Sequence, residues 1–257
     1  MTSAAVQHDS PPRFLVIIPT YNEAENIAPL VEQILALQTP GADVEVLVVD
    51  DNSTDGTSRI VRGMQERFPR LHLICRAGKL GLGTAYLAGF DHALAHGFDF
   101  AFTMDADFSH NPQYIPPMIE LALREGADLV IGSRYVRGGG VRRWGLHRKV
   151  LSFTANLLAH TALGLRARDC TSGFRCYSRR LLAFLRTLNV QSHGYSCLME
   201  LLFYSERAGA RIAEHPIIFV DREQGASKVS KNEIFRALRT LRQLFPRRFQ
   251  KTPVLKG

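Results

Sequence analysis

Residues 14–23 read FLVIIPTYNE, and residues 44–53 read VEVLVVDDNS. Each stretch contains an apolar run that stops at a proline or at acidic residues, which is typical of a buried strand followed by a turn. Between the two, apolar residues recur on one face at helical spacing: Ile27, Leu30, Val31 and Ile34. We therefore predict a strand at 14–18, a helix at 25–37 and a second strand at 44–49.

The alternation of strand and helix continues to residue 132. Further strands are predicted at 71–74, 100–104 and 129–132, and further helices at 57–67, 84–95 and 116–125. This order predicts an α/β fold with a mostly parallel central sheet flanked by helices. In open sheets of this kind, ligands bind outside the carboxyl ends of the strands. We expect the functional site where acidic and small residues follow those ends.

The composition is that of an ordinary globular protein with a surplus of basic residues. Of 257 residues, 46% are hydrophobic and 22% are charged, and the net charge is +8. The length is sufficient for one sizeable α/β domain with a buried core. The positive balance predicts anionic partners, such as nucleic acid, acidic lipid or phosphorylated substrates, although a role in solubility alone is an alternative.

The cysteines and the apolar runs bear on the compartment. The four cysteines form no CxxC pair, so zinc and thioredoxin-type sites are disfavoured and reduced thiols are expected. Residues 1–13 lack the apolar run of a secretory signal, and no run of 18 apolar residues is present. We expect a cytoplasmic protein whose contact with any membrane is peripheral.

The motif Asp105-Ala106-Asp107 follows the apolar strand FAFTM at 100–104. Two carboxylates that close a buried strand are costly unless a cation pairs with them. Mg²⁺ and Mn²⁺ prefer oxygen ligands and often bridge to substrate phosphates, whose charge must be neutralised when a pyrophosphate leaves. The motif therefore predicts a metal site at Asp105 and Asp107, and a pair of turn or capping aspartates is the alternative.

Two other segments follow predicted strands. Asp50 and Asp51 close the second strand, where a carboxylate can accept hydrogen bonds from a ribose or a base; the alternative is a capping cluster for the next helix, a role that Asp55 could fill alone. Gly81-Leu82-Gly83 resembles a phosphate loop with Lys79 as a candidate ligand, but it lacks the third glycine of a dinucleotide fingerprint. A tight turn into the next helix is the favoured interpretation of these glycines.

The second half of the chain is strongly basic at first. Residues 129–168 contain no Asp or Glu and eight Lys or Arg residues. Arg134 directly follows a predicted strand, and Arg148 and Ser152 lie one turn apart on a predicted helix. Such a set can hold a phosphate bidentately, and a solvated basic face is the alternative. The glycine run 138–140 predicts a mobile loop.

Two C-terminal features are also candidates for function. Arg222 and Lys228 flank Gly225 after a predicted strand at 217–220, and such a loop can close over phosphates or remain a solvent loop. Residues 234–245 predict a basic amphipathic helix, which either docks on a membrane or packs on the domain. We divide the chain into a flexible N-terminus at 1–12, a catalytic domain at 13–233, and a C-terminal helix and tail at 234–257.

Taken together, the motifs resemble those of the dolichol/polyprenol-phosphate mannose synthases, inverting family-2 glycosyltransferases of the GT-A fold. The resemblance extends from about residue 13 to 245 and rests on PTYNE (19–23), VVDDNS (48–53), DGT (55–57), KLGLGTAY (79–86), MDAD (104–107), SHNP (109–112), GSRY (132–135), TSGFR (171–175) and VDR (220–222). Many members of that family carry transmembrane helices, and this sequence resembles the subtype without them.

The resemblance implies roles for the matching residues. The nucleoside of GDP-mannose would be held by Pro19, Tyr21, Glu23, Val49 and Asp51. The diphosphate and a Mg²⁺ or Mn²⁺ ion would meet Asp105, Ala106 and Asp107, with Ser109 at a position where some relatives carry a glutamine ligand. The acceptor phosphate would be gripped by Arg134, Arg148 and Ser152, and Arg134 would also act with Asp105 and Asp107 in catalysis. Arg134, Arg222 and Lys228 would contact the donor, the last two from a closing loop.

The implied reaction is transfer of mannose from GDP-mannose to a polyprenyl phosphate, with inversion, at the cytoplasmic face of a membrane. The protein would bind that surface peripherally, alone or with a membrane-anchoring protein. Alternatives are transfer of glucose to the same lipid, transfer of mannose to a soluble acceptor, or a basic nucleic-acid-binding protein. No nucleic-acid partner is expected, because carboxylates at strand ends repel a phosphate backbone in the absence of a metal.

Overall fold

The computed structural model describes residues 10–188, 190, 192, 194, 196–221 and 231–255, apart from the side chains of 146–149, 151 and 231–236. Its strands are β1 (Arg13–Thr20), β2 (Asp43–Asp50), β3 (Leu71–Cys75), β4 (Phe100–Thr103), β5 (Leu129–Ser133), β6 (Gly140–Arg142), β7 (Arg175–Ser178), β8 (Ile212–Pro216) and β9 (Ile218–Val220). The helices are α1 (Ala24–Leu35), α2 (Thr57–Gln65), α3 (Leu82–Ala95), α4 (Ile115–Glu125), α5 (Leu146–Leu163), α6 (Arg179–Arg186), α7 (Ser196–Arg207) and α8 (Lys231–Arg247), with a 3₁₀ turn at Pro112–Tyr114.

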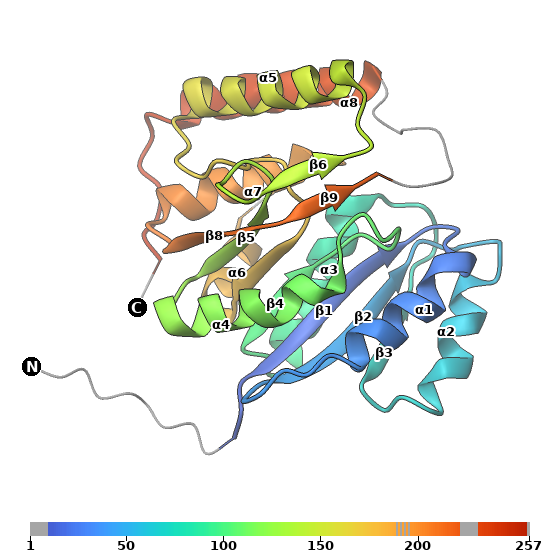
Figure 1. The fold of residues 1–257 in the computed structure, drawn as a ribbon. Helices are drawn as coiled ribbons and strands as arrows, with labels where there is room; N and C mark the ends of the chain where they lie inside the picture. The colour runs from blue at the N-terminus through green and yellow to red at the C-terminus, as the bar shows by residue number, and fades with distance from the viewer. Residues whose placement is uncertain are drawn as a thin grey trace, which may run out of the picture.

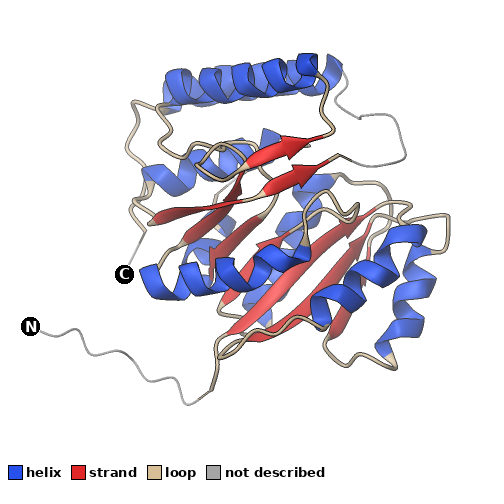
Figure 2. Ribbon diagram, in the orientation of Figure 1, coloured by secondary structure: helices blue, strands red, loops and turns tan. Residues whose placement is uncertain are grey.

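Seven of the strands form one sheet in the order β3-β2-β1-β4-β7-β5-β8, with helices on both faces (Figures 1 and 2). Neighbouring strands are parallel except at β7, which runs antiparallel to both β4 and β5. The prediction of an α/β fold with a mostly parallel central sheet is confirmed. The remaining strands, β6 and β9, form a small parallel ribbon.

Strand β1 lies at the centre of the core, because residues 14–18 are all fully buried. Side chains alternate between the two faces of a strand. Leu15 and Ile17 accordingly pack in the cluster that contains α3, α6 and α7, whereas Phe14, Val16 and Ile18 pack in the cluster that contains α1, α2 and α4. Helix α3 approaches the sheet so closely that a Cβ at Gly89 would lie 2.5 Å from Ile17, so this position requires glycine.

The second half of the chain departs most from expectation. Sequence reasoning identified neither the antiparallel strand β7 nor the helices α6 and α7. The glycine run 138–140, expected to be a mobile loop, is instead partly ordered into a strand, since Gly140 begins β6 and pairs with Ile218. Gly139 is packed against the end of β5, where a Cβ would lie 2.5 Å from the Ser133 carbonyl oxygen.

The predicted basic helix at 234–245 corresponds to α8, which lies beside α5 at the top of Figure 1 and also contacts α7. Leu241 and Leu244 face inward and are 9% and 1% exposed, whereas Leu238 and Phe245 are each 48% exposed. One face therefore packs on the domain and another faces outward. The proposed division of the chain at residue 233 stays a prediction. Within the described residues, no helix combines the length and apolar character needed to cross a bilayer.

Candidate active site

The acidic motif follows β4 and is fixed by its neighbours. The Thr103 hydroxyl donates to the Gly173 carbonyl at 2.7 Å, which joins the end of β4 to the segment before β7. The Tyr86 hydroxyl donates to Asp105 Oδ1 at 3.4 Å, and Asp107 Oδ1 accepts from the Ser109 amide at 3.0 Å. Both carboxylates are therefore held at the carboxyl end of the sheet, where the fold places ligands.

The donor set of this motif suits a hard divalent cation. Ser109 is 1% exposed, and its Oγ has no hydrogen-bond partner among the described residues. A buried hydroxyl without a protein partner usually bonds a water, an ion or a ligand. No cluster of three or more His, Cys, Asp or Glu side chains in the described part of the chain could hold a metal alone. Asp105 and Asp107 could hold Mg²⁺ or Mn²⁺ if substrate phosphates and water supplied the remaining oxygens, as these ions usually require.

His110 lies beneath the motif as a neutral side chain. Burial lowers its pKa to about 4, against the opposing effect of the Asp107 charge, so the imidazole is uncharged at neutral pH. Its Nδ1 accepts a hydrogen bond from the Asp105 amide at 3.3 Å, and its ring packs between Phe174 and Phe219 at centroid distances of 5.2 and 5.3 Å. The approach of Nδ1 to Asp105 Oδ2 at 4.0 Å is therefore not an ion pair.

The two acids at the end of β2, Asp50 and Asp51, have different partners. Asp50 is held inside the fold, where it accepts from the Thr20 hydroxyl at 2.9 Å and from the Ser53 amide at 3.0 Å. Asp51 pairs with the Arg76 guanidinium and accepts from the Gly81 amide at 2.9 Å. Neither acid is the N-cap of α2, which is Gly56; Asp55, one residue earlier, accepts from the amide of Thr57 at 3.0 Å.

Arg76 was missed by sequence reasoning, although its position directly after β3 was a usable signal. It donates to Thr84 Oγ1 at 2.6 Å and to the Gly81 carbonyl at 3.0 Å. The glycine turn is thereby fastened to Asp51. Lys79, from the same turn, lies 3.8 Å from the centroid of the Tyr21 ring, within the range of a cation–π contact. The loops after β1, β2 and β3 thus meet at one place.

The remaining residues predicted to bind the nucleoside lie at the same edge. Pro19 and Val49 are partners in the register of β1 and β2, but the Val49 side chain is fully buried in the core, so only its backbone can face a ligand. Glu23 Oε2 accepts from Asn26 at 2.9 Å. Ala106, between the two aspartates, is 4% exposed.

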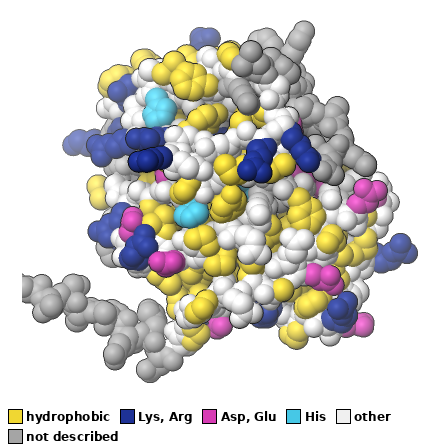
Figure 3. Space-filling view, in the orientation of Figure 1, with side chains coloured by type: hydrophobic (Ala, Val, Ile, Leu, Met, Phe, Trp, Pro, Cys, Tyr) yellow, Lys and Arg dark blue, Asp and Glu magenta, His cyan; other side chains and the backbone are white. Residues whose placement is uncertain are grey.

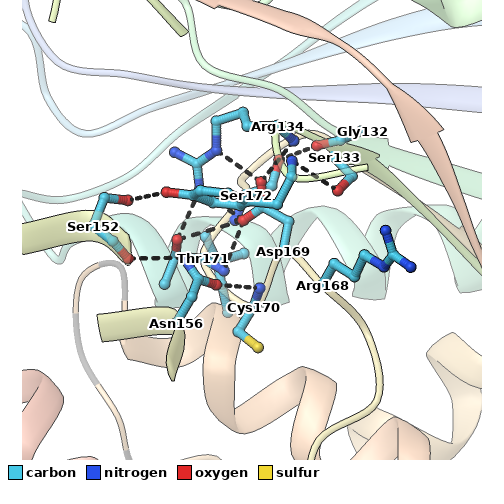
Figure 4. Close-up of polar contacts among 12 residues, drawn as sticks. Gly132, Ser133, Arg134, Ser152, Asn156, Arg168, Asp169, Cys170, Thr171 and Ser172 are labelled. Carbon is cyan, nitrogen blue, oxygen red and sulfur yellow. Dashed lines mark hydrogen bonds and ion pairs between the residues drawn. The ribbon is translucent and has the colours of Figure 1, made fainter. Parts of the chain in front are cut away.

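Arg134 lies at the end of β5 (Figure 4). Asp169, Thr171 and three aromatic rings surround its guanidinium, and we call this set the cradle; the sequence did not predict it. Its Nε and Nη2 donate to the two carboxylate oxygens of Asp169, both at 2.7 Å, and Nη2 also donates to Thr171 Oγ1 at 2.7 Å. Three aromatic rings surround the guanidinium at 5.5–5.7 Å from their centroids: Tyr135, Trp144 and Phe219. Asp169 is the first acid after the acid-free stretch 129–168, which was the available signal.

The Arg134–Asp169 pair is ionised. Burial alone would lower the pKa of Arg134, but the facing Asp169 carboxylate raises it above its ordinary value, with a smaller contribution from Asp105. Burial would likewise raise the pKa of Asp169, but Arg134 lowers it. One face of the Arg134 fork is thus occupied by Asp169, while Nη1 donates to no residue in the described part of the chain. Nη1 remains suited to an anion.

The structure brings part of the predicted acceptor site together. The Tyr135 hydroxyl donates to Ser152 Oγ at 2.8 Å, which places Ser152 of α5 next to the residue after Arg134. Arg148 is also on α5, but its side chain lies outside the described residues, as do Arg222 and Lys228 entirely. A Cβ at Gly173 would lie 3.7 Å from Asp105 Oδ1, so the segment that follows Asp169 and Thr171 runs alongside the acidic motif.

This arrangement of strand-end carboxylates, a glycine turn and a buried arginine at the edge of a mostly parallel sheet suits a transferase that handles phosphorylated substrates. The family model for glycosyl transferase family 2 matches residues 15–185, and the chain belongs to this family. The predicted family resemblance is confirmed, and the protein is an enzyme of the glycosyltransferase class.

Two curated relatives are closely similar. The chain is 44% identical to a polyprenol monophosphomannose synthase of Mycolicibacterium smegmatis, over 88% of this chain and 84% of that protein. It is also 44% identical to an undecaprenyl-phosphate mannosyltransferase of Micrococcus luteus, over 85% and 88% respectively.

Solved structures of more distant proteins support the fold. Glucosyl-3-phosphoglycerate synthase from Mycobacterium tuberculosis, in complex with Mn²⁺, UDP and glucosyl-3-phosphoglycerate, has a TM-score of 0.65 at 23% identity, over 92% of this chain and 80% of that one. The complex of the same enzyme with UDP has a TM-score of 0.64 at 22% identity, over 90% and 79%. At this identity the likeness bears on the fold alone, and it agrees with the predicted GT-A fold.

Proposed function

We propose that this protein transfers mannose from GDP-mannose to a polyprenyl phosphate, with inversion at the anomeric carbon. The observation that carries the proposal is that Asp105, at a strand end, lies alongside the segment whose Asp169 and Thr171 hold the buried Arg134, in a chain 44% identical to a polyprenol monophosphomannose synthase. A site that holds two phosphorylated substrates needs both cation recruitment and fixed positive charge.

Asp105 and Asp107 would hold Mg²⁺ or Mn²⁺, and Ser109 would complete the oxygen set directly or through water. When bound, the cation neutralises the charge of the departing diphosphate. The solved complex with Mn²⁺ and UDP in a protein of the same fold supports this choice of cofactor. On the nucleoside side, Asp51 and the backbone at Val49 would face the base and ribose, with Tyr21 beside them.

The chemistry would be a single displacement. An oxygen of the acceptor phosphate forms a bond to the anomeric carbon while the bond from that carbon to the diphosphate oxygen breaks, and GDP leaves with the electron pair. The attacking phosphate is already anionic at neutral pH, so the site needs no strong general base. Arg134, with Ser152 and Arg148 on α5, would hold this phosphate in line, which is where positioning contributes to rate.

The outer face of α5 and α8 suits the lipid. On α5, Val150, Phe153 and Leu157 are 57%, 59% and 50% exposed, and α5 contains no acidic residue. Hydrophobic side chains gather at the top of the space-filling view, over these helices (Figure 3). Arg239 and Arg242 on α8 are also exposed, and basic residues contribute about 1 kcal/mol each near an anionic surface. Peripheral binding to the cytoplasmic face of a membrane follows as part of the proposal.

The experiment is a donor panel. GDP-mannose, GDP-glucose, UDP-glucose and UDP-mannose are each supplied with Mn²⁺ and a short polyprenyl phosphate, and product is separated by thin-layer chromatography. The proposal expects mannolipid from GDP-mannose, which should also give the largest rise in melting temperature. UDP-glucose is the main competitor, because the solved proteins of this fold bind it. Glucolipid as the principal product would replace the proposed function with glucosyl transfer.

A further inference from the structure

The segment from Arg166 to Ser172 has an unusual pattern of support. It belongs to no helix or strand, yet each of its seven consecutive backbone amides donates to a side chain of the described structure. The four side chains that accept these bonds are Glu206, Glu214, Asn156 and Asp169. We name this segment the amide-held loop. Buried or half-buried backbone amides need partners, so the four acceptors define the path of the loop.

Two glutamates hold the first four amides in pairs. Glu206 on α7 accepts from Arg166 at 2.8 Å and from Ala167 at 3.0 Å. Glu214 on β8 accepts from Arg168 at 2.8 Å through Oε2 and from Asp169 at 3.1 Å through Oε1. Each carboxylate thus accepts from two adjacent amides. The second amide bound by Glu214 is that of Asp169, whose carboxylate binds Arg134.

The remaining amides lead into the cradle itself. Asn156 on α5 accepts from the Cys170 amide at 2.8 Å and donates to the Ser152 carbonyl at 2.9 Å. Asp169 Oδ1 accepts from the amides of Thr171 and Ser172 at 3.2 and 3.0 Å. The backbone of Asp169 is therefore fixed by Glu214 on one side, and its carboxylate is fixed by its own loop and by Arg134 on the other.

We propose that Glu214 is a positioning residue for Arg134, acting through Asp169. It is not a catalytic residue, because among the described residues the hydrogen bonds of its carboxylate go to backbone amides of the loop. This inference rests on the proposed function only for the role of Arg134 toward a phosphate. The support comes from strand β8, which is parallel to and hydrogen-bonded with β5, the strand that ends beside Arg134. Glu214 therefore connects the backbone of Asp169 to the same part of the sheet that positions Arg134.

Glu206 provides a matched control. It accepts the same kind of paired amide bonds from the same loop, but its amides belong to Arg166 and Ala167, whose side chains take no part in the cradle. Replacing either glutamate with glutamine removes one charge and leaves one acceptor oxygen for two amides. A purely structural effect on the loop would therefore be similar for Glu206→Gln and Glu214→Gln.

The test is a double-mutant cycle in the full-length protein. We expect Glu214→Gln to reduce kcat/KM for polyprenyl phosphate about tenfold, Glu214→Asp to recover part of the loss, and Glu206→Gln to change it by less than about twofold. In an Arg134→Lys background, Glu214→Gln should cause little further loss. An equal loss from the two glutamine variants, or the same fold-loss with and without Arg134, would overturn the proposal.

A second readout does not depend on activity. The ¹⁵N NMR signal of the Arg134 Nε–H group, assigned by its absence in Arg134→Lys, should shift or broaden in Glu214→Gln and stay in place in Glu206→Gln. An unmoved signal in Glu214→Gln contradicts the positioning role, whatever the protein transfers. Full turnover by Arg134→Lys would instead refute the proposed role of Arg134 in the reaction, so the two failures are distinguishable.

Discussion

Arg134 and Asp169 form a bidentate ion pair in which both hydrogen bonds measure 2.7 Å. The Asp169 side chain is fully buried and that of Arg134 is 8% exposed. Because Nε and Nη2 of the guanidinium both donate to Asp169, the arginine is fixed in orientation before any substrate binds. A preoriented cation of this kind costs little reorganisation during the reaction.

Removal of one partner of this pair should be strongly destabilising. Asp169→Ala leaves the Arg134 charge buried and uncompensated, which is expected to lower the free energy of unfolding by about 3–5 kcal/mol. The control is Asp91→Ala, which removes an exposed pair: the side chains of Asp91 and Arg186 are 56% and 32% exposed, and the change should be about 0–1 kcal/mol. Urea unfolding measures both. Similar losses for the two variants would contradict the importance of the buried pair.

Ser109→Ala separates stability from metal use. The Ser109 hydroxyl is buried without a partner, so its removal should leave the melting temperature unchanged or raised, because no hydrogen bond is lost. The Mn²⁺ concentration for half-maximal turnover should rise. The control is Ser205→Ala, which loses a buried 2.7 Å bond to the Leu201 carbonyl and should be destabilised by about 1 kcal/mol with an unchanged metal requirement. An unchanged Mn²⁺ requirement in Ser109→Ala would remove Ser109 from the metal site.

Arg76→Ala tests the nucleoside side of the site. The variant releases both Asp51 and the glycine turn, so the KM for GDP-mannose should rise about tenfold while the KM for polyprenyl phosphate stays constant. Arg62→Ala is the matched control, because Arg62 donates to Cys75 at the end of the same strand and does not contact Asp51. A parallel rise in both KM values would show that Arg76 supports the fold in general.

The exposed apolar face of α5 should bind vesicles. Phe153→Glu with Leu157→Glu places two charges where the proposal puts the lipid surface, so flotation with anionic vesicles should fall several-fold. Leu123→Glu, on α4, is 43% exposed and serves as the control, with no expected change. Equal flotation of all three proteins would exclude α5 from membrane binding.

The histidines near the end of α3 predict a pH dependence of stability. Burial, aided by the charges of His96 and His72, lowers the pKa of His92 from its ordinary value of 6.5 to about 4. Between these values the unfolded chain binds a proton that the folded chain does not, so stability falls as the pH drops. Thermal unfolding of His92→Gln should lose less stability than the wild type between pH 7 and pH 5. An identical loss would show that other groups dominate.

Much of the fold could be predicted because its first half repeats simple patterns. The fully buried run at 14–18 is apolar throughout, and the acid pairs at 50–51 and 105–107 come at the ends of similar runs. Strand β7 gave no such signal, because it begins with Arg175, a fully buried arginine. Its guanidinium donates to the carbonyls of Leu198 and Cys170 at 2.6 and 2.9 Å, which only the folded chain can supply.

The site was predictable to the same extent. Asp105, Asp107 and Asp51 could be proposed as site residues because strand-end carboxylates are local features of the sequence. Arg76 and Asp169 were missed because each acquires its role through a partner far away in the sequence, Asp51 for the first and Arg134 for the second. Spacing alone does not predict such pairs, since they depend on how loops from different strands meet.

The central claim is that Asp105 and Asp107 recruit a divalent cation that the transfer of mannose requires. The most direct measurement is the rate of mannolipid formation from GDP-mannose by protein depleted with a chelator, before and after Mn²⁺ is restored, for the wild type and for Asp107→Asn. The account predicts that wild-type transfer stops on depletion and returns with Mn²⁺, whereas the variant stays inactive in both conditions. Undiminished transfer by the depleted wild-type protein would contradict it.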